Sequence, residues 1–289
     1  MRYTIARLNR EFPNEDACLK FLFEAKKLQA CPRCGTEPRF YKLKDRKCYS
    51  CMHCALHIYP TAGTIFHKSE TPLKSWFFAI FLFGNSKNGV SAKELERHLG
   101  VTYKTAWRMA RQIRSLMTGG DSPLGGIVEV DETYIGGKSN SAGRFKDKTA
   151  VIGAVEKQKN TSRVKAITSQ KVNAAIALPF IRASVKAGTS IQTDESRIYS
   201  RLHHEYEHSS VVHSKGQYVD GDTHTNTIEG FWSQMKRSID GTYHCVSPKH
   251  LQLYVDEFVY RYNLRNAPVF PALIAQACLP VAVVGESRV

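Results

Sequence analysis

The feature that most constrains the fold of this chain is a pair of Cys-x-x-Cys motifs near its N-terminus. Cys31 and Cys34 form the first pair, Cys51 and Cys54 form the second, and 16 residues separate the two. This spacing is typical of a four-cysteine site, in which two tight turns each offer two thiolates to a tetrahedral zinc ion. One structural Zn²⁺ would stabilise a fold that is too small to be stable without it. We therefore predict a zinc ribbon in the N-terminal part of the chain.

The choice of ligands has alternatives, because Cys48 lies three residues before Cys51 and forms another Cys-x-x-Cys pair with it. His53 and His57 are possible substitute ligands. We expect Cys51 and Cys54 to bind the ion, and Cys48 to be an extra thiol.

The charge balance of the chain indicates an anionic partner. Its 289 residues contain 41 Lys and Arg against 26 Asp and Glu, a formal net charge of +15. Nucleic acid is the first candidate, and a solvated basic surface is the alternative. The N-terminus lacks the apolar region of a signal peptide, and the longest apolar run, WFFAIFLFG at 76–84, is too short to cross a bilayer. We expect a core helix there and a cytoplasmic protein.

Residues 91–116 read as two short helices around a tight turn. Ser91 and Glu94 form a capping box for the first helix, Gly100 ends it, and Thr102 caps the second. This arrangement favours a DNA-reading helix-turn-helix, and an ordinary helical hairpin with a basic face is the alternative. The inward residues of the second helix would be Ala106, Ile113 and Leu116; the outward ones would be Tyr103, Lys104, Arg108, Arg111 and Arg114.

The second half of the chain has the pattern of a mixed sheet. Three strand patterns in a row predict a meander, and the later alternation of strands and helical stretches predicts parallel crossovers. The strands are expected at 125–136, 148–158, 163–170, 189–196 and 209–214, and helices at 173–188 and from about 225. We predict a multidomain α/β protein with an N-terminal segment and zinc ribbon (1–68), a helix-turn-helix region (69–120), a ribonuclease H-like mixed sheet flanked by helices (121–270) and a C-terminal tail (271–289).

Three acids lie where such a sheet would bring them together. Asp131 is on the first strand, Asp194 ends the fourth, and Glu229 is on the helix after the fifth. Converging carboxylates repel each other unless cations lie between them, and their hard oxygens suit two Mg²⁺ or Mn²⁺ ions. Lys236, seven residues after Glu229, would face the same way and reach a phosphate, and Asn226 would support the site. The alternative is that these acids are solvated surface residues, with Asn226 and Glu229 merely starting a helix.

Several motifs together resemble a known family. The chain is similar, from about residue 12 to 266, to bacterial insertion-sequence transposases of the DDE superfamily with an N-terminal zinc ribbon. A gap of 34 residues between Asp194 and Glu229, followed by the lysine at plus seven, is also similar to such enzymes. The motifs are CPRCG, CMHC followed by TAGTIFH, VDETYIGGK, TDESRIYS, HTNTIEGFWSQMKR and YVDEFVYRYN.

The resemblance implies a ribonuclease H-like domain that cuts and rejoins DNA at element ends. Asp131, Asp194 and Glu229 would hold two Mg²⁺ or Mn²⁺ ions, and Lys236 would contact the DNA end. Asn226 is the alternative third ligand, and we favour Glu229 because a carboxylate binds these ions more strongly.

The resemblance also implies particular partners and surroundings. The zinc ribbon and the helix-turn-helix would bind the terminal inverted repeats, with Arg108, Arg111 and Lys104 on the DNA, in a homodimer or larger assembly at the nucleoid. In the segment 247–263, Glu257 and Arg261 would surround the site, and a surface ion pair is the alternative. The rival functions are a DNA-binding regulator and a structure-selective nuclease or resolvase.

Overall fold

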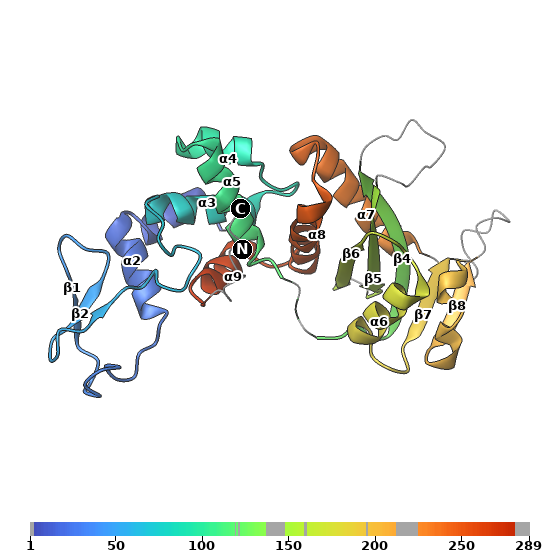
Figure 1. Ribbon diagram of the computed structural model, residues 1–289, viewed down its shortest axis with the longest axis horizontal. Helices are drawn as coiled ribbons and strands as arrows, with labels where there is room; N and C mark the ends of the chain where they lie inside the picture. Colours follow the sequence, from blue (N-terminus) through green and yellow to red (C-terminus); the bar gives the residue numbers. More distant parts are fainter. Residues whose placement is uncertain are drawn as a thin grey trace. The chain divides into compact units, whose positions relative to one another are not determined.

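The computed structural model of this chain has two compact units. It describes residues 3–118, 120, 122–136, 148–158, 161–194, 196–211 and 225–280. The first unit contains the described residues of 1–86, 92–116 and 267–280, and the second those of 87–91 and 117–266 (Figure 1). The chain therefore passes between the units more than once. None of the helices in these residues is both long and apolar enough to span a membrane.

The N-terminal part of the first unit is a small antiparallel sheet preceded by two helices. Helices α1 (Ile5–Glu11) and α2 (Glu15–Glu24) come first, followed by β1 (Phe40–Lys42), β2 (Tyr49–Cys51) and β3 (His57–Ile58) in that spatial order. The side chain of Asn14 caps α2 by accepting a hydrogen bond from the backbone of Ala17 at 2.9 Å. Phe23 of α2 stacks on Tyr49 of β2 with 4.0 Å between ring centroids and also contacts Phe40 of β1, so aromatic packing joins the helix to the ribbon.

The rest of the first unit packs around α3 (Leu73–Asn85). The apolar run at 76–84 forms this helix, and Trp76, Phe77, Ile80 and Phe83 are buried, as the sequence predicts. Helix α9 (Val269–Ala277) packs against α3 where Gly84 leaves room, since a Cβ on Gly84 would lie 2.8 Å from the backbone nitrogen of Phe270. The segment after residue 270, expected as a tail, therefore begins with most of a core helix.

The predicted helix pair is present as α4 (Ala92–Leu99) and α5 (Tyr103–Arg114). Gly100, at φ +65°, adopts the left-handed conformation that ends α4, and the hydroxyl of Thr102 accepts a hydrogen bond from Thr105 N at 3.3 Å to cap α5. One expectation is wrong: Arg114 is buried rather than outward. Its guanidinium lies 5.2 Å from the ring centroid of Phe83, a cation–π contact that compensates part of its burial.

The second unit is built on the mixed five-stranded sheet that the sequence predicts. The order is β6-β5-β4-β7-β8; β4, β5 and β6 form an antiparallel meander, and β7 and β8 continue from β4 in parallel (Figure 1). The strands are β4 (Ile127–Gly136), β5 (Lys148–Glu156), β6 (Val164–Ser169), β7 (Ser190–Asp194) and β8 (Glu207–Val211), with helices α6 (Ala174–Ser184), α7 (Asn226–Ser238) and α8 (Pro248–Asn263).

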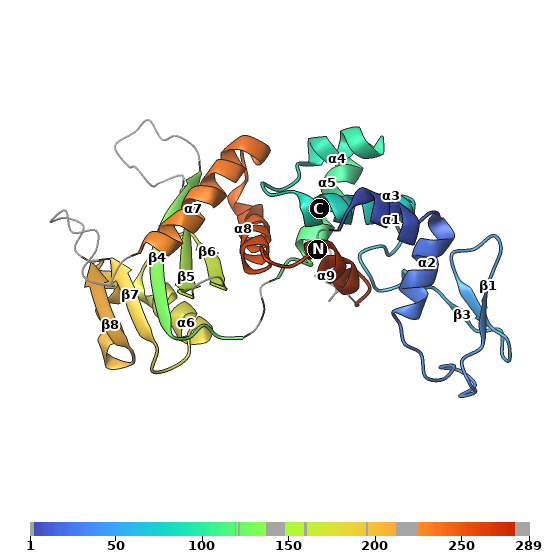
Figure 2. The same cartoon turned by 180° about the vertical axis from the view of Figure 1, so that it is seen from behind.

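Each face of this sheet has its own apolar core, because side chains alternate along a strand. Val128, Val130 and Ile191 pack with α6 on one face. Val151 and Val155 pack with α7 and α8 on the other (Figure 2). The apolar stripe predicted on α7 is buried in this second core, and consists of Ile228, Phe231, Trp232, Met235 and Ile239.

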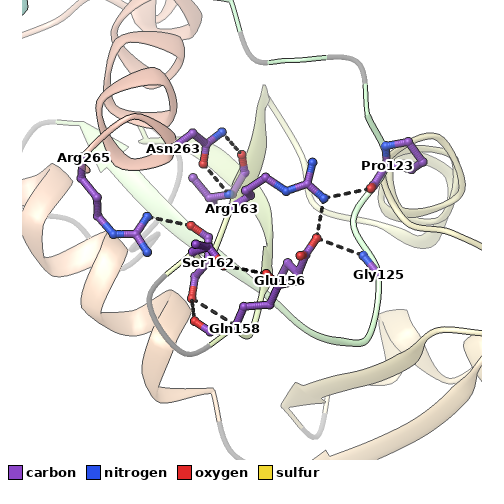
Figure 3. Close-up of polar contacts among 10 residues, drawn as sticks. Pro123, Gly125, Glu156, Gln158, Ser162, Arg163, Asn263 and Arg265 are labelled. Atoms are coloured by element: carbon purple, nitrogen blue, oxygen red, sulfur yellow. Dashed lines mark hydrogen bonds and ion pairs between the residues drawn. The ribbon is translucent and has the colours of Figure 1, made fainter. Parts of the chain in front are cut away.

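Polar contacts fix the edge of the sheet where the chain enters it and where α8 ends (Figure 3). Asn263 accepts a hydrogen bond from Val164 N at 2.7 Å and donates one to the carbonyl of the same residue at 3.0 Å. The buried carboxylate of Glu156 accepts from the guanidinium of Arg163 at 2.6 Å and from Gly125 N at 3.2 Å. These contacts join α8, the β5–β6 hairpin and the entering chain.

The pair Glu257–Arg261 is not at the surface, so the surface alternative is wrong. The Glu257 side chain is fully buried and that of Arg261 is 10% exposed, with 2.6 Å between nitrogen and oxygen. The Tyr243 hydroxyl donates to Glu257 at 2.9 Å and accepts from Val90 N at 3.1 Å. A Cβ on Gly89 would lie 1.8 Å from that hydroxyl, so the segment 87–91 is held closely in the second unit.

We expect Gly153→Ala to destabilise the second unit by about 1–3 kcal/mol, because an added methyl group would overlap a packed ring. A Cβ at Gly153 would lie 2.6 Å from Cη2 of Trp232. Gly230→Ala is the control, since no atom lies within 4 Å of its Cβ and alanine favours the helix. Urea denaturation measures both, and equal effects would contradict this packing.

Candidate functional site

The four predicted cysteines form one cluster at the ribbon. Their sulfur atoms all lie within 4.8 Å of one another, with 3.6 Å between Cys31 and Cys54 and 3.9 Å between Cys34 and Cys51. A tetrahedral zinc site with Zn–S bonds of about 2.3 Å has sulfur–sulfur separations of about 3.8 Å. The cluster could therefore hold one structural zinc ion.

The local backbone explains how two short turns bring these thiols together. Gly35 N donates to the carbonyl of Cys31, and Ala55 N donates in the same way to the carbonyl of Cys51. Both turn residues have positive φ, +68° at Gly35 and +55° at Ala55, which lets the chain reverse directly after each cysteine pair. The turns are thus two copies of one knuckle.

The electrostatics at Cys34 favour a metal-binding thiolate. A hydrogen bond with the Thr36 hydroxyl, 3.0 Å from the sulfur, lowers the pKa of Cys34 to about 6. Cys48 is buried outside the cluster, and His53 and His57 are exposed outside it, so the preferred ligand set is the one that the structure assembles.

We expect the wild-type chain to contain about one equivalent of zinc, and Cys31→Ser to lose most of it. The same substitution should weaken DNA binding, because the ribbon loses its internal crosslink. Cys48→Ser is the matched control and should keep the metal. Metal analysis of the purified proteins would test this, and a zinc-free wild type would refute it.

Asp131 and Asp194 lie on adjacent strands of the five-stranded sheet in the second unit. The parallel ladder between β4 and β7 pairs Val128 with Ile191 and Glu129 with Gln192. Extended by two residues beyond this last pair, the same register would bring Asp131 level with Asp194, and alternation would place both on the face that α7 covers. Adjacent strands are about 4.8 Å apart, so the two carboxylates are neighbours.

The environment of Asp131 penalises its negative charge. Burial raises its pKa to about 7, and the nearby charges of Glu132 and Asp194 act in the same direction. Trp232 of α7 donates its indole N–H to Oδ2 of Asp131 at 3.0 Å, which fixes the carboxylate against the helix. Backbone N–H of Ser196 donates to Asp194 at 3.1 Å.

Glu229 lies on α7, one turn before Trp232, and its side chain is exposed. The hydroxyl of Thr225 donates to Oε1 of Glu229 at 2.9 Å. Thr225 is the N-cap residue and Asn226 is the first helical residue, so the interpretation of Asn226 as a cap is wrong. Asn226 and Lys236 are both exposed. In the described ranges the only group of three or more potential metal ligands is the four cysteines, and the three acids do not form such a group.

Two further acids on β4 escape prediction from the sequence. Glu129 is fully buried and accepts hydrogen bonds from the first turn of α7. Glu132 points to the opposite face, where the Tyr199 hydroxyl donates to it at 2.6 Å. The alternation of side chains in the segment GIVEVDETY places Glu129 on the same face as Asp131, and this pattern could have identified Glu129. No local sequence pattern connects Tyr199 to Glu132.

The predicted DNA-binding cations share one exposed side of α5. Lys104, Arg108 and Arg111 are spaced at i, i+4 and i+7, and all three are exposed. Arg108 lies 3.4 Å from the Ser69 hydroxyl, and the guanidinium of Arg111 lies 5.9 Å from the ring centroid of Trp107. Flat cationic groups on one helix side can contact phosphates or base edges.

We expect Asp131→Asn to remove a pH-dependent cost of folding. The pKa of Asp131 rises from 3.8 to about 7 on folding, so the folded chain retains a proton that the unfolded chain releases between these values. The free energy of unfolding therefore falls as the pH rises through this window, by at most about 4 kcal/mol. Without divalent ions, the Asn variant should lack this decline in urea denaturation between about pH 4 and pH 8. Parallel pH profiles would contradict the prediction.

Comparison with known proteins gives matches to both parts of the chain. Residues 123–263 match the family described as ISXO2-like transposase domain, and residues 13–57 match the transposase zinc-ribbon domain. An uncharacterized protein in transposable element ISH50 of Halobacterium salinarum is 25% identical over 269 residues, which are 84% of this chain and 88% of that protein.

Two other similarities are weaker or shorter. An uncharacterized transposase-like protein of Haemophilus influenzae is 29% identical over 102 residues, 35% of this chain and 81% of that protein. Among solved structures, a simian T-cell lymphotropic virus intasome in complex with PP2A regulatory subunit B56 gamma has a chain with a TM-score of 0.31 and 13% identity. The match covers 58% of this chain and 63% of that one, and the TM-score is too low to support a statement about the fold.

Proposed function

We propose that this chain, which belongs to the insertion-sequence transposases with an N-terminal zinc ribbon, cuts DNA at the ends of its element and joins those ends to target DNA. The observation that carries the proposal is the parallel pairing of β4 with β7, whose register, continued by two residues, would bring Asp131 level with Asp194; Trp232 of α7 is bonded to Asp131 there. The relative in transposable element ISH50, which matches over most of its length, supports a role for this chain in a transposable element.

The donor set fits divalent cations. Two neighbouring carboxylates with hard oxygens suit Mg²⁺ or Mn²⁺, and a bound cation would offset the burial and the nearby negative charges that raise the pKa of Asp131. When bound, two such ions activate a water or a 3′-hydroxyl and stabilise the leaving oxygen of a phosphodiester. Asp131 and Asp194 would hold both ions, and Glu229 would complete the set from the helix.

Side chains on the exposed part of α7 would bind the DNA end. Lys236 lies two turns after Glu229 on the same side of the helix, where its ammonium can contact a phosphate. Asn226, in the first turn and exposed, would contact substrate or support the site. Thr225 would orient Glu229 through the hydroxyl that donates to it.

The first unit would recognise the element ends. Four thiols gathered at one point and an exposed row of cations on α5 support binding of double-stranded DNA by the ribbon and the helix pair together. Lys104, Arg108 and Arg111 are the contacts that we propose, with base reading by the two arginines. Because two ends must be joined, a dimer or larger assembly would act on DNA at the bacterial nucleoid.

Asp194→Asn is expected to reduce cleavage and joining by more than about 100-fold, because a metal-holding carboxylate is lost. Binding to the element ends should change by less than about twofold, since phosphate contacts supply most of that affinity. The assay uses the full chain, a matched pair of element ends, Mg²⁺ and a plasmid target, with gel-shift measurements beside it. Equal loss of binding and cleavage would refute the metal-holding role.

The wild-type reaction in the same assay separates the rival functions. Cleaved ends that join the plasmid support the transposase. Cleavage without any joined product would indicate a nuclease on this fold, and end binding without cleavage would indicate a DNA-binding regulator. Either of the last two results would overturn the proposed function.

A further inference from the structure

We propose that Glu129 is a positioning residue that fixes Glu229 relative to Asp131, an inference that rests on the proposed function. Glu129 lies two residues before Asp131 on β4, and it contacts Thr227, two residues before Glu229 on α7. The contact therefore joins β4 and α7 at a point that is two residues away from a proposed metal ligand on each element.

The first turn of α7 needs an unusual partner. The first N–H groups of a helix have no acceptor within the helix, and the side chain of the N-cap residue commonly supplies one. Thr225, the N-cap residue here, makes no such bond, and its hydroxyl donates to Glu229. The carboxylate of Glu129 replaces it: Oε2 accepts from Thr227 N at 2.8 Å and from Ile228 N at 2.9 Å.

The remaining oxygen of Glu129 is held as well. The Thr227 hydroxyl donates to Oε1 at 2.8 Å, so three hydrogen bonds from α7 converge on one fully buried carboxylate. Burying a carboxylate is costly unless it is hydrogen-bonded, and the positive end of a helix favours it there. These bonds disappear if the start of α7 slides or rotates on the sheet, which makes the contact a rigid anchor.

A second contact fastens the same helix to the same strand. One turn beyond Glu229, the indole of Trp232 donates to Asp131 at 3.0 Å. Two contacts with β4 therefore flank Glu229 along α7. The first turn of the helix is bonded to Glu129 before it, and Trp232 is bonded to Asp131 after it. The two contacts together determine how far the Glu229 carboxylate stands from that of Asp131.

Glu129→Gln tests this anchor with a minimal change of shape. The amide places an N–H₂ against donors that need an acceptor, so the first turn of α7 should shift and ion binding should weaken. We expect a 10- to 100-fold higher Mg²⁺ concentration for half-maximal cleavage, in the range typical of residues that support metal ligands. End binding should stay within about twofold of wild type, because most of the proposed contacts with the element ends lie in the first unit.

Glu156→Gln is the matched control for loss of a buried carboxylate. Glu156 is also buried and lies on the neighbouring strand, but it pairs with Val128 and so faces α6, where it binds Arg163 and Gly125. This variant should lose thermal stability without any change in the Mg²⁺ requirement. A general effect of destabilisation would move both variants alike.

A milder pair of variants keeps the test decisive if Glu129→Gln does not fold. Thr227→Val removes the hydroxyl that donates to Glu129 and should raise the Mg²⁺ requirement several-fold. Thr227→Ser retains the hydroxyl and should behave like wild type.

Quenching of tryptophan fluorescence by Mn²⁺ supplies a readout without catalysis, since Trp232 is bonded to Asp131. The part of the quenching that comes from Trp232 is the part that Trp232→Phe removes. In Glu129→Gln this part should require about tenfold more Mn²⁺ than in the wild type, and in Glu156→Gln it should require the wild-type concentration.

The possible results separate this inference from the proposed function. If the wild type shows no metal-dependent cleavage, the proposed function fails. If it cleaves, but Glu129→Gln and Thr227→Val match their controls in Mg²⁺ requirement and Mn²⁺ quenching, the positioning role is overturned and the proposed function stands. Raised requirements in both variants, with the controls unchanged, support the role of Glu129.

Discussion

The parallel pairing of β4 with β7 is the interaction on which the candidate site depends. It joins strands that are distant in the sequence, and its register, continued by two residues, would bring Asp131 beside Asp194. A shift of the pairing by one residue would turn Asp194 to the face of α6, because side chains alternate along a strand. The apolar residues Val128, Val130 and Ile191 oppose such a shift, since it would move them out of the core. The site therefore inherits its geometry from the packing of the sheet.

The acids of β4 differ in how the protein satisfies their charge. Glu129 accepts hydrogen bonds from the start of α7, and Glu132 accepts one from Tyr199 on the other face. Asp131 accepts the indole N–H of Trp232, yet its pKa still lies well above the usual range, mainly because of burial. A buried carboxylate that keeps a raised pKa near other acids is the pattern expected where an ion binds. Two acids on the same strand therefore differ in role: Glu129 is held by hydrogen bonds from α7, whereas Asp131 is a candidate for ion binding.

Sequence periodicity and spacing were enough for the ribbon cysteines, the meander followed by parallel strands, and the strand positions of Asp131 and Asp194, because these follow from local patterns. The tertiary cap by Glu129 and the Tyr199–Glu132 contact could not be read in this way, since each partner is remote in the sequence. Arg114 is a different case. It lies four residues after buried Ala110, so helical spacing indicated the inner side, and its charge argued wrongly for the outer one.

Helix α9 gives the chain an interleaved organisation. The ring of Phe270 lies 4.3 Å from that of Tyr3, so the first and last parts of the described chain share one aromatic contact. A fragment ending before residue 267 would leave the side of α3 around Gly84 open to water, although the whole five-stranded sheet would still be present. No single cut can release the two units intact, and loss of the C-terminal segment would first unsettle the unit that begins the chain.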